Sequence, residues 1–147
     1  MKFLLFRKLP RLIRLWQNIL TRRHIQQKIP DFNSENYLEL ILMLFSFDTP
    51  LTVNDLVVHL QIKKSRVIIL IEDLNKHGYT SARVNTKAKN EHFIFLTKKG
   101  QIVAPAIQQV FYKADGIIHK HVDPRHLIVF NEIINQILKT RSNHKAT

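Results

Sequence analysis

Basic side chains gather at the start of a predicted helix in the middle of the chain. The helix spans residues 64–77. Lys63 directly precedes it, and Lys64 and Arg66 lie in its first turn. The helix is predicted from apolar residues that recur at three- and four-residue spacing, namely Val67, Leu70, Ile71 and Leu74. The first turn of a helix has unpaired backbone amides, and cationic side chains beside such amides bind phosphate groups. These residue types therefore predict a surface for a polyanion.

Two uncharged residues, Ser65 and Ile69, fall on the outward face of the same helix. Against duplex DNA, the isoleucine would contact a thymine methyl group in the major groove. An exposed isoleucine is equally consistent with an ordinary surface side chain or with a contact to another helix of the chain. The spacing alone leaves these three interpretations open.

A second basic segment follows at residues 79–96. Two β-prone stretches, YTSARV and HFIFL, flank the polar loop NTKAKNE, a pattern typical of a hairpin. Its polar and cationic candidates for binding are Arg83, Lys87, Lys89 and Asn90. A hairpin placed directly after a helix-turn-helix is a wing, whose cations would lie on the phosphate backbone or enter the minor groove. The alternative is an ordinary solvated loop.

The charge of the whole chain favours a polyanionic partner. Twenty-three Lys and Arg residues oppose eleven Asp and Glu residues, which gives 147 residues a formal net charge of +12. Nucleic acid is the first class of partner to consider, and an anionic membrane surface is the second. Residues 1–30 contain no acidic residue. Their basic, amphipathic character keeps open a membrane-surface or protein-interaction module as the rival function.

Several functional classes have no support in the sequence. The chain has no cysteine, which excludes disulfides and thiolate zinc sites, and it has no glycine-rich phosphate loop or known catalytic motif. We therefore expect no catalytic residues, no cofactor and no metal. The pair His119 and His121 lacks a nearby carboxylate cluster, so it resembles solvated helix-end residues more than a zinc site. No apolar run is long enough for a membrane span, which predicts a soluble protein.

The elements before the basic helix are predicted from caps and periodicity. A first helix begins near Leu9, with Pro10 in its first turn. The next begins after a cap at Asn33 or Ser34 and contains the nearly continuous apolar run YLELILMLFSF.

A helix-turn-helix follows. Thr52 and Asp55 have the spacing of a capping box for its first helix, and a short joint at 61–63 leads to the basic helix. Gly78 is placed for a left-handed cap at the end of that helix.

The last two helices are predicted after the hairpin. Thr97 is placed to cap a long helix in which Pro105 predicts a kink or a broken first turn. Asp123 and Pro124 form a cap and first-turn pair for the final helix.

This order predicts a mainly α fold with a small β-hairpin wing. We expect a single domain over residues 1–147, with a winged helix-turn-helix at 31–100 and dimerisation helices at 1–30 and 101–147. A winged helix of about 70 residues cannot cover the apolar stripes of the additional helices, so these stripes need a partner surface. The predicted dimer-interface residues are Leu12, Trp16, Ile19, Leu127, Phe130 and Ile134.

The segment LTVNDLVVHLQIKKSRVIILIEDLNKHGYT, followed by HFIFLTKKG, resembles the winged helix of the MarR family. Its polar, Lys-rich character is most similar to the SarA-like, staphylococcal branch. The resemblance covers about residues 35–100, and DPRHL falls where the family often starts a helix. It implies a cytoplasmic bacterial homodimer that regulates transcription by binding double-stranded DNA. Related regulators often bind small aromatic acids, and Arg11, Arg14 and Tyr37 are candidates to line such a space.

One departure concerns the tip of the wing. The family usually has an Asp-x-Arg element before the second strand of its wing, and the corresponding residues here are Ala88, Lys89 and Asn90. The salt bridge that would brace the wing cannot form, and no arginine is available at this point for the minor groove. A regulator that heterodimerises and binds DNA with weak sequence preference is therefore a further alternative.

Overall fold

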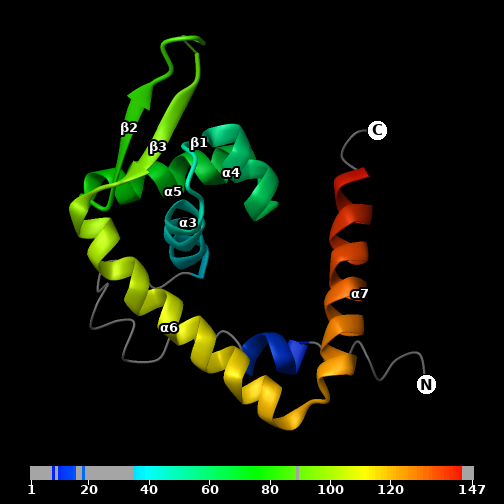
Figure 1. The fold of residues 1–147 in the computed structure, drawn as a ribbon. Coiled ribbons are helices and arrows are strands. Elements are labelled where there is room, and N and C mark those ends of the chain that lie inside the picture. The colour runs from blue at the N-terminus through cyan, green and yellow to red at the C-terminus, as the bar shows by residue number, and fades with distance from the viewer. Residues whose placement is uncertain (1–7, 9, 16–17, 19–34, 89, 144–147) are drawn as a thin grey trace. The chain divides into compact units, whose positions relative to one another are not determined.

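The computed structural model describes residues 8, 10–15, 18, 35–88 and 90–143 (Figure 1). These residues are mostly helical and include a small antiparallel sheet of three strands. The predicted fold class is confirmed. The chain divides into two compact units, Met1–Phe111 and Tyr112–Thr147. No described helix combines the length and hydropathy needed to cross a bilayer.

Three helices form the core of the first unit: α3 (Glu35–Ser46), α4 (Val53–Leu60) and α5 (Lys64–Lys76). Each contributes one apolar face, and these faces pack together with Tyr79 and Ile94. The stripe predicted for α5 is confirmed, because all four of its residues, Val67, Leu70, Ile71 and Leu74, are buried. The outward face of α5 is thereby fixed as well.

Local hydrogen bonds set the start of α4 as the sequence predicts. The Asp55 amide donates to Thr52 Oγ1 at 3.2 Å, and the Thr52 amide donates to Asp55 Oδ2 at 2.8 Å, which completes a capping box. Gln61 ends the helix in the left-handed region at φ 54°. Gly78 adopts φ 79° just after α5, as its position predicts.

The sheet has the order β1-β3-β2, with β1 at Leu51–Thr52, β2 at Thr80–Val84 and β3 at His92–Leu96. Strands β2 and β3 form the predicted hairpin, in which Val84 pairs with His92 and Thr80 with Leu96. Strand β1 was not predicted. Its two residues are too few to show an alternating pattern, and it exists because Leu51 pairs with Ile94 on the other edge of β3.

Helix α6 (Lys98–His121) is continuous through Pro105, so of the two expected outcomes, a kink or a broken first turn, the broken first turn is wrong. Proline has no backbone N–H, so the Gln101 carbonyl group, four residues earlier, lacks its helical hydrogen-bond donor. Gln101 and Pro105 are both exposed, so water can bind this carbonyl group. The predicted cap is confirmed, because the Gly100 amide donates to Thr97 Oγ1 at 3.2 Å.

In the second unit, α7 (Pro124–Asn143) begins as predicted. Asp123 Oδ1 accepts the Arg125 amide at 2.9 Å, and Pro124 is the first helical residue. Bonds from Arg125 lower the pKa of the Asp123 carboxyl group below its ordinary value.

The predicted dimer-interface residues have partly known positions. Phe130 and Ile134 are 48% and 37% exposed on α7, and Leu127 is half-buried. Leu12 is 47% exposed within the helical residues 10–15. Trp16 and Ile19 lie outside the described residues, as do the proposed caps Asn33 and Ser34.

We expect Gly100→Ala to lower the free energy of unfolding by about 1 to 3 kcal/mol, because an added Cβ would overlap the Tyr79 carbonyl oxygen and approach the Leu96 side chain. Chemical denaturation at a fixed protein concentration measures this change. Gly116→Ala is the matched control in the same helix. No atom lies within 4 Å of its added Cβ, so this variant should be stabilised by about 0.5 to 1 kcal/mol. Equal stability of the two variants would contradict the packing.

Candidate nucleic-acid interface

The outward face of α5 presents the predicted DNA-binding residues to solvent. Lys63, Lys64, Ser65 and Arg66 are all exposed at its first turn, and Ile69 is 46% exposed one turn later. Lys63 is the N-cap residue and makes no side-chain cap bond. The first turn of α5 therefore combines open backbone amides with cationic side chains, which suits an anionic ligand.

Two polar contacts that the sequence did not reveal add to the core packing of α5. The Tyr37 hydroxyl on α3 donates to Asp73 Oδ2 on α5 at 2.6 Å. Thr80 Oγ1, at the start of β2, donates to Asn75 Oδ1 on α5. Burial and the bond to Asp73 raise the pKa of Tyr37, while the positive charge of Arg66 acts in the opposite direction. Helix α5 is thus bonded to both α3 and β2.

The loop of the wing is braced by hydrogen bonds between Asn85 and Glu91 and by a bond from the Lys87 amide. The Asn85 amide donates to the Glu91 carbonyl oxygen at 2.9 Å, and Asn85 Nδ2 donates to Glu91 Oε2 at 3.3 Å. The Lys87 amide donates back to Asn85 Oδ1 at 3.0 Å, which tightens the turn. Asn85 and Glu91 therefore stabilise a loop that lacks the Asp-x-Arg salt bridge.

The predicted wing residues occupy two different places. Lys87 and Asn90 are exposed at the tip, and Lys89 lies outside the described residues. Arg83 lies on β2, with its guanidinium 5.2 Å from the centre of the Phe95 ring on β3. This cation–π contact holds Arg83 against the sheet while its side chain stays exposed.

A hollow of about 420 Å³ separates α5 from the wing, and we call it the helix–wing hollow. It brings two predicted residues, Lys64 and Asn90, to one site. The sequence did not indicate the role of Asn54 and His92 as further lining residues, because only the strand register and the packing of α4 place them there. The remaining lining residues are Thr52, Val53, Ile68, Glu72 and Glu91.

The start of α6 is fastened to the end of α5. Lys99 Nζ donates to the His77 carbonyl oxygen at 2.8 Å and lies 4.2 Å from the centre of the Tyr79 ring. Thr97 Oγ1 donates to the Gly78 carbonyl oxygen. The LTKKG segment therefore satisfies carbonyl groups at the C-terminus of α5, where a cation is favourable.

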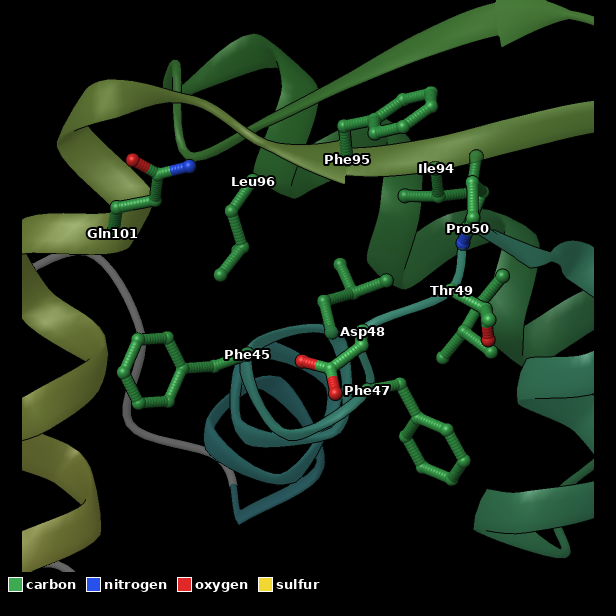
Figure 2. Close-up of a pocket in the computed structure, with 11 residues that line it drawn as sticks. Phe45, Phe47, Asp48, Thr49, Pro50, Ile94, Phe95, Leu96 and Gln101 are labelled. Atoms are coloured by element: carbon green, nitrogen blue, oxygen red, sulfur yellow. The ribbon is translucent and has the colours of Figure 1, made fainter.

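A second hollow of about 390 Å³ lies where α3, β3 and α6 meet, and Figure 2 shows its lining. The Phe45 and Phe47 rings point in opposite directions, with the Asp48 carboxylate between them, and Leu96 projects from β3. Tyr37, Arg11 and Arg14, the residues suggested for an effector site, are not among those that line this hollow.

The histidine pair on α6 has no metal-binding arrangement around it in the described part of the chain. His119 Nδ1 lies 2.8 Å from the Asp115 carbonyl oxygen, within the same helix. No group of three or more His, Asp and Glu side chains gathers as metal ligands among the described residues.

Solved structures share this fold. S. aureus MepR in its DNA-binding conformation is 16% identical, with a TM-score of 0.78, over 92% of this chain and 97% of that chain. A putative MarR family transcriptional regulator from Listeria monocytogenes, complexed with 26mer DNA, is 16% identical, with a TM-score of 0.78. The match covers 95% of this chain and 89% of the Listeria chain. A MarR family regulator from Streptomyces coelicolor, in complex with DNA, is 20% identical, with a TM-score of 0.76. The match covers 93% of this chain and 85% of the Streptomyces chain.

These similarities establish a shared fold across nearly the whole chain. They confirm the fold implied by the resemblance to the MarR family, and they do not distinguish the SarA-like branch. No protein-family model and no curated protein matches the sequence.

We expect Tyr37→Phe to lower the free energy of unfolding by about 1 to 2 kcal/mol, because Asp73 loses a donor in a partly buried site. Denaturant titration near neutral pH measures the loss. Tyr112→Phe is the control, since Tyr112 is 63% exposed and should tolerate the change with little effect.

The raised pKa of Tyr37 adds a pH dependence to the stability of the wild-type protein. Its contribution to stability is present below the ordinary tyrosine value of about 10 and declines as the pH rises above that value. This decline should be smaller in Tyr37→Phe, and an identical alkaline profile would contradict the contact.

Proposed function

We propose that this protein is a dimeric, sequence-specific, double-stranded DNA-binding transcription regulator of the MarR type. The observation that carries the proposal is the exposed cationic first turn of α5 beside a wing, with Lys64 and Asn90 lining one hollow between them. The net charge of +12 favours a polyanion, and solved structures with the same fold include complexes with DNA.

In this proposal α5 enters the major groove from its N-terminal end. Lys63, Lys64 and Arg66 contact phosphate groups that flank the groove, and Ser65 and Ile69 reach base edges. A thymine methyl group is the partner for Ile69, whose exposed apolar surface would be covered by the contact.

The wing supplies the second contact. In the proposed complex, the contacts to the DNA phosphate backbone or the edge of the minor groove come from Lys87, Lys89 and Asn90. Arg83 approaches the DNA from β2. Because the tip has no arginine, this contact contributes mainly non-specific affinity. The Lys-rich, arginine-poor wing also supports placement in the SarA-like branch, with the cytoplasmic location that bacterial regulators have.

The proposed assembly is a homodimer that positions two copies of α5 on a pseudo-palindromic site, about one turn of DNA apart. Support comes from α7, where every residue from 128 to 140 is exposed, including apolar Phe130 and Ile134. The organisation belongs to the same proposal: one domain over 1–147, with DNA binding at 31–100 and dimerisation through 1–30 and 101–147.

The decisive experiment selects bound members from a pool of random duplexes and measures their affinity across a series of salt concentrations. We expect a pseudo-palindromic motif. The double variant Lys64→Ala, Arg66→Ala should lose it and lower the salt slope of the logarithm of affinity by about two, because each phosphate contact contributes roughly 0.9. The control Lys113→Ala, Lys120→Ala removes the same charge from α6 and should retain the motif.

Other outcomes would support the rival functions. Binding without a motif that ignores the α5 variant would show that α5 does not read DNA. If Arg11→Ala, Arg14→Ala instead abolished binding to anionic lipid vesicles, the membrane-surface function of the first helix would replace the proposal. A motif that emerges only when a related regulator is added would establish the heterodimer.

We expect Phe130→Glu, Ile134→Glu to convert a dimer into a monomer, because two charges would have to be buried in the apolar interface. Sedimentation velocity across a concentration series measures the change. Gln136→Glu lies away from the apolar stripe of α7 and should remain dimeric. A wild-type protein that sediments as a monomer at every concentration would refute the proposed assembly.

A further inference from the structure

We propose that His92 is an additional DNA-contacting residue, and that its protonation adds a phosphate contact in the helix–wing hollow and makes DNA binding tighter as the pH falls. This inference rests on the proposed function. It adds a residue outside the predicted binding set and a form of regulation to the same interface.

The placement of His92 comes from the strand register. It is the first residue of β3, pairs with Val84 on β2 and is exposed at the base of the wing loop. His92 lines the hollow together with Lys64 from the first turn of α5 and Asn90 from the wing. A phosphate group bound by both α5 and the wing would therefore pass beside His92.

The charges around His92 explain why one proton matters. From α5, Lys64 and Glu72 line the hollow, and the wing contributes Glu91. The other lining residues, from β1, α4, α5 and the wing, are uncharged, and the strand partner on β2 is Val84. With a neutral imidazole, the described lining has one cation and two carboxylates, whereas a protonated imidazole balances them.

This balance acts directly on an approaching phosphate. The Glu91 carboxylate accepts a bond from Asn85 Nδ2 within the wing, and the Glu72 carboxylate has no hydrogen bond or ion pair with another described residue. The excess negative charge repels phosphate when the imidazole is neutral. Histidine side chains gain a proton between about pH 8 and pH 5, and the imidazolium form donates from both ring nitrogens. Binding of DNA is thereby coupled to uptake of a proton.

The salt dependence separates this contact from an internal one. If protonated His92 only paired with Glu72 or Glu91, the wing would be drawn toward α5 without any additional phosphate being neutralised. A new phosphate contact instead releases further counterions, and the slope of log affinity against log salt becomes steeper by roughly 0.9.

The test measures the affinity of the full-length protein for its selected duplex, by fluorescence anisotropy, over a salt series at about pH 8 and about pH 5.5, the range in which histidine titrates. We expect the wild-type slope to steepen by roughly 0.9 at the lower pH. His92→Gln should lose this change and keep the shallow slope. His92→Lys, which has a fixed charge, should show the steeper slope at both values. Circular dichroism at each pH verifies that every variant is folded.

His126→Gln is the matched control, because His126 is exposed on α7 in the other compact unit. It should retain the wild-type change in slope. Two outcomes would overturn the role of His92 while leaving DNA binding intact. One is a change in the salt slope with pH that persists in His92→Gln, and the other is a wild-type salt slope that is the same at both pH values. A wild-type protein without a selectable duplex would overturn both this inference and the proposed function.

Discussion

Burial of one face of α5 is the interaction on which the rest of the structure depends. Val67, Leu70 and Leu74 are fully buried against α3 and α4, and each such side chain contributes roughly 1.5 to 3 kcal/mol. A helix with one apolar stripe has a single way to bury it, so the same packing turns Lys64 and Ile69 outward. The cationic surface is therefore a consequence of core packing, and it does not require any attraction among the charged groups.

The wing depends on this packing through the short connection after α5. Tyr79 is buried in the core, its amide donates to the Leu74 carbonyl oxygen at 2.9 Å, and Thr80 bonds to Asn75. These contacts set where β2 begins, and pairing with β3 then places the loop opposite the first turn of α5. The helix–wing hollow arises from two elements that are each fixed to one core. Its shape should therefore be sensitive to mutations at Tyr79 or Gly100, although neither residue lines it.

Charge is distributed unevenly over this interface. The chain is strongly basic, yet the hollow between α5 and the wing contains Glu72 and Glu91 beside Lys64. Long-range attraction to DNA follows from the net charge, whereas the fit of one phosphate group follows from the few side chains around it. In the proposed function, the net charge would speed association with any duplex, and the side chains of the helix–wing hollow would adjust the final contact. The hydrogen bonds between Asn85 and Glu91 keep the loop in place without an arginine at its tip.

The sequence by itself determined the elements whose signals are local. Helical periodicity identified the buried stripe of α5, side-chain spacing identified the capping box of Thr52 with Asp55, and the need for φ > 0 identified Gly78. The exposure of Lys63, Lys64 and Arg66, which belong to the predicted DNA-binding set, followed from the same periodicity. Only the tertiary structure decided the contacts between residues far apart in the chain. Tyr37 with Asp73, Lys99 with the end of α5, strand β1, and His92 beside Lys64 each depend on how separate elements pack. Periodicity within one segment shows which face is buried, but it contains no information about which residue of another segment lies opposite.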